Sequence, residues 1–238
     1  MNAAVHSITW QGLTLAFVPT LIVLVIMWRW SAGVGHGVYA TARMLAQLLL
    51  IGYVLVYIFE TGEPGVVLGV LGFMLLVSSW ISMQPLHNKS PRIYRNAFIS
   101  ISVSGLLTLA LVSQVVIGIE PWFDPRYLIP LAGMIFAGAM TTISLAGERV
   151  QAEVSRGVSY PEARRIAMHA ALIPIINSLF AVGLVSLPGM MTGQILSGVS
   201  PMVAAKYQIV VMSMLFGVTG MSAAIFLYLE QESVKRAS

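Results

Sequence analysis

Met190 and Met191 form the pair of neighbouring side chains in this sequence that is best suited to metal chemistry. They follow Pro188 and Gly189, where the chain leaves an apolar stretch. Two adjacent thioether sulfurs can bind a soft metal ion. Methionine is more often an adaptable apolar filler, and no histidine or cysteine lies nearby in the sequence to complete a site. Metal binding and apolar packing are therefore both possible roles of this methionine pair, and packing is the favoured one.

Arg43 and Gln47 are a second candidate site, inside another apolar stretch. Four residues apart on a helix, they would share one face. An arginine within a membrane span costs about 2.5 kcal/mol or more and normally faces protein or water. The pair therefore indicates a pore or a subunit contact. Alternatively Arg43 extends its side chain to the cytoplasmic headgroups, because it lies about one turn inside the stretch.

The third candidate is the segment from residue 157 to residue 174. Gly157 predicts a turn, and a helix should follow with Pro161 near its first turn and Glu162 where the helix dipole favours an anion. The residues that carry this candidate are Gly157, Tyr160, Pro161, Glu162, Arg164 and Arg165. A short amphipathic helix stiffly joined to a membrane span suits the passing of force from a soluble partner. On pattern alone, an ordinary amphipathic connector is the better explanation.

The common enzyme motifs are missing from the sequence. His6, His36, His87 and His169 include no His-x-x-x-His pair, and no Gly-x-Ser-x-Gly elbow or Walker A motif occurs. We therefore expect no catalytic activity and no cofactor on this chain. Any ATP-driven function needs a separate ATPase, which would bind the ATP and magnesium.

The composition indicates a membrane as the setting for these residues. Of 238 residues, 58% are apolar and 9% are charged, whereas soluble domains have about 25% charged residues. So few charges could not cover a soluble fold, but lipid tails need none. Cysteine is absent, which excludes disulfides and thiolate metal sites. We predict an all-α, polytopic integral membrane protein with one transmembrane domain over residues 1–238. The net charge of +4 does not indicate a nucleic-acid partner.

About seven transmembrane helices are predicted, since each needs about 20 mainly apolar residues. The stretches are Ile8–Met27, Val38–Phe59, Val66–Met83, Ala97–Ile119, Tyr127–Leu145, Ala170–Leu187 and Val203–Leu229. A six-span alternative, with the first stretch lying on the membrane surface, stays open. The uncharged segment Pro188–Pro201 is expected in the membrane interface or as a re-entrant segment.

The orientation follows from the cations between the spans. One set of connections holds Arg29, Lys89, Arg92, Arg95, Arg149, Arg156, Arg164, Arg165, Lys235 and Arg236. The opposite set holds only Arg126 and Lys206. Because cytoplasmic loops are enriched in lysine and arginine, we predict an outside N-terminus and a cytoplasmic C-terminus. Gly147–His169, the longest polar stretch, is then expected as a cytoplasmic loop.

Small residues and prolines suggest close helix packing in the predicted fifth and sixth spans. Gly133 and Ala137 form a small-xxx-small pair, and Gly138 is expected to extend the same face. Pro130 and Pro174 each free a backbone carbonyl that a neighbour or water must satisfy. A moving helix bundle and static packing are equally compatible with these features.

Several stretches together resemble a known family. Gly183-Leu-Val-Ser-Leu-Pro-Gly-Met-Met-Thr-Gly193, followed by Pro201 and Ala205-Lys-Tyr-Gln-Ile209, resembles the FetB-type permeases. Arg43-x3-Gln47-x4-Gly52-Tyr53, Ile129-Pro-x-Ala-Gly-Met134 and Ala170-Ala-Leu-Ile-Pro174 fit as well. This bacterial family is associated with iron export and is related to plant permeases of aluminium-tolerance ABC transporters.

The resemblance implies the permease subunit of an ABC transporter in the bacterial inner membrane, exporting an iron-like metal ion. Two copies would form the pathway, and two copies of a separate ATPase would dock chiefly around residues 157–169, which raises the force-transmitting interpretation above that of a plain connector. The implied pathway or interface residues are Arg43, Gln47, Met134, Asn177, Ser186, Pro188, Met190 and Met191. Family members often carry polar or charged residues where this chain has Val77, Gly138, Asn177 and Phe180. A stand-alone channel or secondary transporter, and a non-transporting scaffold, remain the alternatives.

Overall fold

The computed structural model describes residues 8–235, except for the side chains of Thr61 and residues 232–235. Within this range every regular element is a helix, apart from one isolated bridge between Val182 and Ser186. The all-α prediction is therefore confirmed. His6 and Arg236, named above, lie outside the described residues.

The helices fall into two compact units, residues 1–61 and residues 62–238. The first unit contains α1 (Trp10–Leu15), α2 (Val18–Arg29) and α3 (Val34–Thr61), with α2 and α3 packed as a hairpin. Gly37 permits this contact, because a Cβ atom there would lie 2.9 Å from the Leu24 Cδ2 atom. The assignment of residues 1–238 to a single permease domain stays a prediction.

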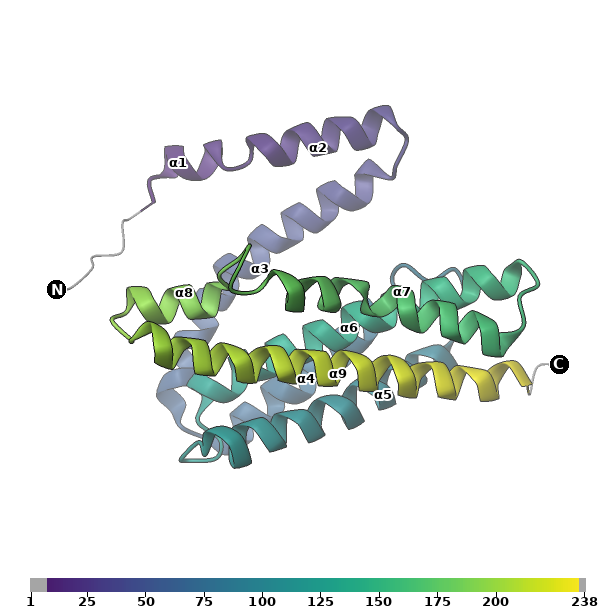
Figure 1. The fold of residues 1–238 in the computed structure, drawn as a ribbon. Helices are drawn as coiled ribbons and strands as arrows, with labels where there is room; N and C mark the ends of the chain where they lie inside the picture. The colour runs from purple at the N-terminus through teal and green to yellow at the C-terminus, as the bar shows by residue number, and fades with distance from the viewer. Residues whose placement is uncertain (1–7, 236–238) are drawn as a thin grey trace. The chain divides into compact units, whose positions relative to one another are not determined.

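The second unit contains the remaining helices (Figure 1). They are α4 (Pro64–Ser82), α5 (Pro91–Ala110) with its π-helical extension η1 (Leu111–Ile117), α6 (Pro125–Ser155), α7 (Tyr160–Ala181), α8 (Gly189–Leu196) and α9 (Pro201–Lys235). Proline in the first turn helps to start α4, α5, α6 and α7, because its missing N–H would be unpaired there anyway. Ser90 and Asp124 cap α5 and α6 by accepting hydrogen bonds from backbone N–H groups.

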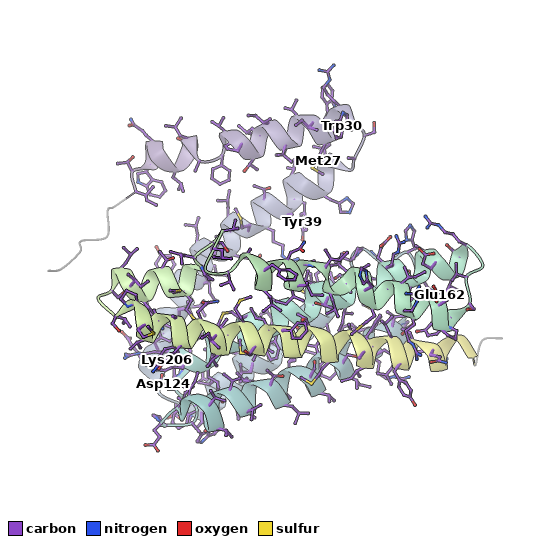
Figure 2. All side chains as sticks on the ribbon, viewed as in Figure 1. Met27, Trp30, Tyr39, Asp124, Glu162 and Lys206 are labelled. Carbon is purple, nitrogen blue, oxygen red and sulfur yellow. The ribbon has the colours of Figure 1, made fainter. Side chains whose placement is uncertain are left out.

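Hydrogen bonds tie the helix ends of the second unit together. The Asn96 amide on α5 donates to Glu230 on α9 over 2.6 Å, and the Gln151 amide oxygen on α6 accepts from the backbone N–H of His87. Because α4, α6 and α9 run opposite to α5 and α7, the cation-rich connections of this unit gather at one end, which we call the cationic end. Figure 2 has Glu162 at this end, with Asp124 and Lys206 at the opposite end. Which end faces the cytoplasm stays a prediction.

A stripe of small polar residues lets α5 pack closely against its neighbours. Ser100, Ser104 and Thr108 are buried at intervals of four, and each hydroxyl donates to the carbonyl four residues earlier. The hydroxyls are thus satisfied within their own helix, and their small volume allows short interhelical distances. Gly105 lies on this helix as well, where a Cβ atom would come within 2.9 Å of the Phe136 ring.

Six helical stretches among the described residues are long and apolar enough to cross a membrane. They are Trp10–Arg29, Val34–Glu60, Pro64–Ser82, Pro91–Ile117, Pro125–Ser155 and Pro201–Gln231. They correspond to six of the predicted spans. The predicted span Ala170–Leu187 differs, because its helix α7 is polar in its first half and ends at Ala181. The apolar part from Ala170 to Ala181 is only about 18 Å long, well short of a hydrocarbon core.

Two local expectations are corrected by the structure. Gly147–His169 is not a loop: α6 continues to Ser155, stabilised by the 2.7 Å ion pair between Arg149 and Glu153, and only four residues separate it from α7. Gly138 does not extend the face of Gly133. Gly138 lies against Leu215 and Thr219 of α9, whereas Gly133 lies near Met74 of α4, because a separation of five residues turns a helix by about 140°.

Candidate functional site

A break in the helix path between α7 and α8 organises the candidate site. The seven residues Val182–Pro188 separate the two helices, and Gly183 has a φ of +81° that favours glycine. The turn is closed by backbone hydrogen bonds, in which the N–H groups of Val185 and Ser186 donate to the Ala181 carbonyl. Figure 1 shows α7 and α8 following one another along α9. Together they run from the cationic end to the opposite end as one discontinuous helix.

A cavity of about 530 Å³ adjoins this break. Four helices and the break supply its walls. The side chains that carry sulfur, nitrogen or oxygen are those of Met134, Asn177, Ser178, Ser186, Met190, Gln208 and Met212. Five residues predicted for the pathway or interface thus line one cavity: Met134, Asn177, Ser186, Pro188 and Met190. Their functional role stays a prediction.

Gln208 on α9 is one of three residues of this cavity with a polar or sulfur-bearing side chain that sequence reasoning missed, together with Ser178 and Met212. Its exposed fraction is 6%, and its Oε1 atom has no hydrogen-bond partner. Leaving a buried polar atom unpaired costs about 1–3 kcal/mol, so such an atom needs an explanation. The available signal was that Gln208 is the one amide side chain in the apolar stretch Val203–Leu229.

A second cavity of about 360 Å³ lies beside the first. Val182, Gln208 and Met212 line both cavities, and Met191, also predicted for the pathway, lines the second. The two methionines of the pair therefore face different cavities. Gln208 lies in the wall between them.

A further groove of about 360 Å³ extends along α6, α7 and α9. Met134, Ser178 and Leu215 line both this groove and the cavity at the break, while Thr142 and Ala171 carry it toward the cationic end. The cavity at the break thus continues as a groove along the helices toward the cationic end.

The six residues predicted for coupling lie together at the cationic end. Gly157, with a φ of +86°, forms the turn before α7, and the other five lie in the first two turns of that helix, so the predicted glycine turn and helix start are confirmed. Glu162 and Arg165 form an exposed ion pair of 2.6 Å. The hydrogen bond from Arg165 holds the pKa of Glu162 below its ordinary value.

Two contacts fasten the start of α7 to the end of α9. The Tyr160 hydroxyl donates to the Leu227 carbonyl over 2.5 Å, and Arg164 Nη1 donates to Gln231 Oε1 over 3.1 Å. Burial raises the pKa of the Tyr160 hydroxyl, which keeps it a donor. The side chains of Pro161 and Arg165 remain exposed. The segment predicted for coupling is therefore both anchored and accessible.

Arg43 and Gln47 belong to α3 in the first unit. Arg43 is half-buried and Gln47 is exposed. Neither lines the cavities described above. Their predicted role in a pathway or interface stays a prediction.

Comparison with known proteins identifies the family. The model of the Uncharacterised protein family UPF0014 matches residues 10–234. The chain belongs to this family. Among its UPF0014 relatives, the Probable iron export permease protein FetB of Escherichia coli is 33% identical, over 94% of this chain and 91% of the relative. No solved structure gave a significant match.

Two further UPF0014 relatives come from photosynthetic organisms. A UPF0014 membrane protein of Synechocystis is 33% identical over 89% of this chain and 81% of its own length. Protein ALUMINUM SENSITIVE 3 of Arabidopsis thaliana is 30% identical over 90% of this chain and 83% of its own length. The family inferred from the residues around the α7–α8 break is thus confirmed, and the chain is a UPF0014 membrane protein.

Proposed function

We propose that this UPF0014 chain is the membrane-spanning permease subunit of an ABC transporter in the bacterial inner membrane. Two copies form the pathway, and a separate ATPase subunit hydrolyses the ATP. The cargo is a metal ion of the iron type, exported from the cell. The name of the relative FetB supports both the metal and the direction.

The observation that carries this proposal is the continuity of α7. Its 22 residues form one helix, about 33 Å long, from the exposed Pro161 to the cavity wall at Asn177 and Ala181. Ala163, Ala167 and Ala171 form a buried stripe along it, at intervals of four. Tight packing transmits strain, so a push on the first turn of α7 acts, through the helix that contains Pro174, on the cavity wall at its far end.

The wall of the cavity that α9 supplies is linked to the same first turns of α7. Tyr160 and Arg164 hold the end of α9, and α9 carries Gln208 and Met212. A protein that docks on the first turns of α7 would therefore act on both helices that line the cavity. This is the task of an ABC permease, whose partner changes shape when it binds and hydrolyses ATP.

Exposed apolar residues beside the break suit a second copy or lipid as neighbour. Phe180, Leu184 and Val185 have exposed fractions of 77%, 89% and 85%. In the proposed homodimer the two breaks face one another, and the second copy closes the open side of the cavity.

The test is reconstitution with an ABC ATPase from the same organism, for which any ATPase gene beside that of this chain is the first candidate. The two proteins should co-purify, and proteoliposomes should move iron only with ATP. Reversing two exposed charges with Arg164→Glu and Arg165→Glu should abolish ATP-driven transport, while Arg126→Glu at the opposite end should leave it intact. Unchanged transport in the double variant, or failure of the ATPase to bind, overturns the proposal.

A stand-alone channel or secondary transporter is the second candidate. The discontinuous α7–α8 helix favours it, because broken helices form the binding sites of many secondary transporters. This candidate requires flux through the chain alone. Metal flux in proteoliposomes that lack any ATPase would support it against the first.

A further inference from the structure

We propose that the cavity at the α7–α8 break is a cation site with neutral donors, which takes a soft metal ion of low charge and rejects trivalent ions. Its ligands are thioether sulfurs of Met134, Met190 and Met212 together with the amide oxygen of Gln208. If the cargo of the proposed function is iron, this site selects iron(II) over iron(III). The inference rests on the proposed metal export and narrows the class of metal ion that is exported.

The methionines converge on this cavity from three separate helices. Met134 comes from α6, Met190 from α8 and Met212 from α9. Met212 is buried, with an exposed fraction of 9%. Methionine has flexible torsions and a polarizable sulfur, so these side chains can adapt their conformation to a bound ion.

Gln208 provides the second, independent observation. Its side chain is more than nine-tenths buried, lines the same cavity as the three methionines, and leaves Oε1 without a partner. An amide oxygen in this state is an acceptor that still lacks its donor or cation. A bound cation would satisfy it and remove the cost of its burial.

The charge of the donor set limits the cargo. The side chains that line this cavity include no carboxylate, histidine or cysteine, and the residues described by the structure contain no cluster of three such groups. Carboxylate oxygens suit hard cations, whereas thioethers select soft ones such as copper(I). A trivalent ion in a neutral, apolar cavity would lose its hydration without an opposing charge, which is costly.

The helix break adds backbone groups to the site. In a membrane, non-helical backbone is tolerated where it is buried in protein or lines a water-filled cavity. Val182 and Ser186 of the break line the cavity, and Val182, Gln208 and Met212 separate it from the second cavity that holds Met191.

Silver(I), a redox-stable soft ion, is the probe for this site. The purified full chain, without any ATPase, should bind silver(I) in a saturable manner, and X-ray absorption should show sulfur neighbours. Iron(III) added as a soluble chelate should not compete. The variant with Met134→Leu, Met190→Leu and Met212→Leu should lose the binding. Gln208→Leu should weaken it about tenfold or more, since even residues that only orient metal ligands contribute this much.

Met74→Leu with Met140→Leu and Met221→Leu is the matched control, because none of these residues lines the cavity. It should bind silver(I) as the wild type does. Absence of sulfur neighbours around silver in the wild type, which needs no variant to fold, overturns the inference. So does equal loss of binding in the two triple variants. The silver assay uses no ATPase, so it tests this site separately from the transport assay. Silver binding together with a failed transport assay would refute the proposed function and leave the cation site intact.

Discussion

At the cationic end of the second unit, several polar side chains form hydrogen bonds between helices, whereas at the α7–α8 break a buried amide oxygen has no hydrogen-bond partner. Asn96 donates to Glu230, Tyr160 to Leu227 and Arg164 to Gln231. At the other end of α9, Gln208 Oε1 has no partner. Paired groups hold helices together, and an unpaired buried acceptor keeps the capacity to bind a ligand. The difference suggests that the cationic end transmits force and that the α7–α8 break binds a ligand.

Breaking a pair at the cationic end should have the largest effect on stability. Asn96→Leu leaves the Glu230 carboxylate without its hydrogen-bond donor and should lower the free energy of unfolding by about 3 kcal/mol. Thermal unfolding in detergent checks it. Asn88→Leu, at an exposed position, is the control and should change little. Equal stability of the two variants would show that the pairing does not hold this end together.

Removal of one hydroxyl should have a smaller effect of the same sign. Tyr160→Phe deletes the 2.5 Å hydrogen bond to Leu227 and should cost about 1 kcal/mol of stability. Tyr94→Phe is the matched control, because its hydroxyl is 3.5 Å from the Leu76 carbonyl. Its loss should be clearly smaller in the same unfolding assay. A larger loss for Tyr94→Phe contradicts the assignment of Tyr160 as an anchor.

At the break, removing a polar group should change the free energy of unfolding in the opposite direction. Gln208→Leu replaces an unpaired buried amide by an apolar side chain, and should raise stability by up to about 1 kcal/mol in the absence of metal. Gln151→Leu, whose amide oxygen accepts hydrogen bonds from His87 and Asn88, should instead lower it. Destabilisation by Gln208→Leu would mean that its amide is already satisfied.

The smallest effect concerns pH. Because Arg165 lowers the pKa of Glu162, their pair contributes stability above the unfolded-state pKa of glutamate, and this is lost as pH falls through the lowered folded-state value. Both side chains are exposed, so the contribution to unfolding should be slight. Carbon NMR of the labelled Glu162 carboxyl should give a pKa below the ordinary value. An ordinary or raised value contradicts the pair.

The helices and the start of α7 could be predicted from local signals. Apolar runs located six candidate spans, and Gly157 with Pro161 located the turn and the first turn of the helix. The pattern of charged residues did not reveal that residues 147–155 continue α6. A polar stretch next to a membrane span can form either a loop or an extension of the helix. Their ion pair with i,i+4 spacing was the available signal.

The break and its partner residues were harder to predict. The chain was expected to leave the span at Pro188, yet α7 already ends at Ala181, whose own carbonyl accepts the backbone hydrogen bonds of the turn. Gln208 and Met212 reach the cavity from a helix that follows in the sequence. Their convergence depends on how α7 and α9 are rotated against each other, which a single sequence does not specify.

The central claim, that α7 links a docking surface to the cavity at the break, can be tested by one labelling rate. The chain has no cysteine, so Leu184→Cys provides a single thiol at the proposed contact between the two breaks, at a position that is 89% exposed in the single chain. In the complex with its ATPase, a non-hydrolysable ATP analogue should change the rate at which a water-soluble reagent modifies this thiol. Val115→Cys on η1 should show no change, and the charge reversals Arg164→Glu and Arg165→Glu should abolish the effect. A labelling rate at residue 184 that is the same with and without the nucleotide would contradict the claim.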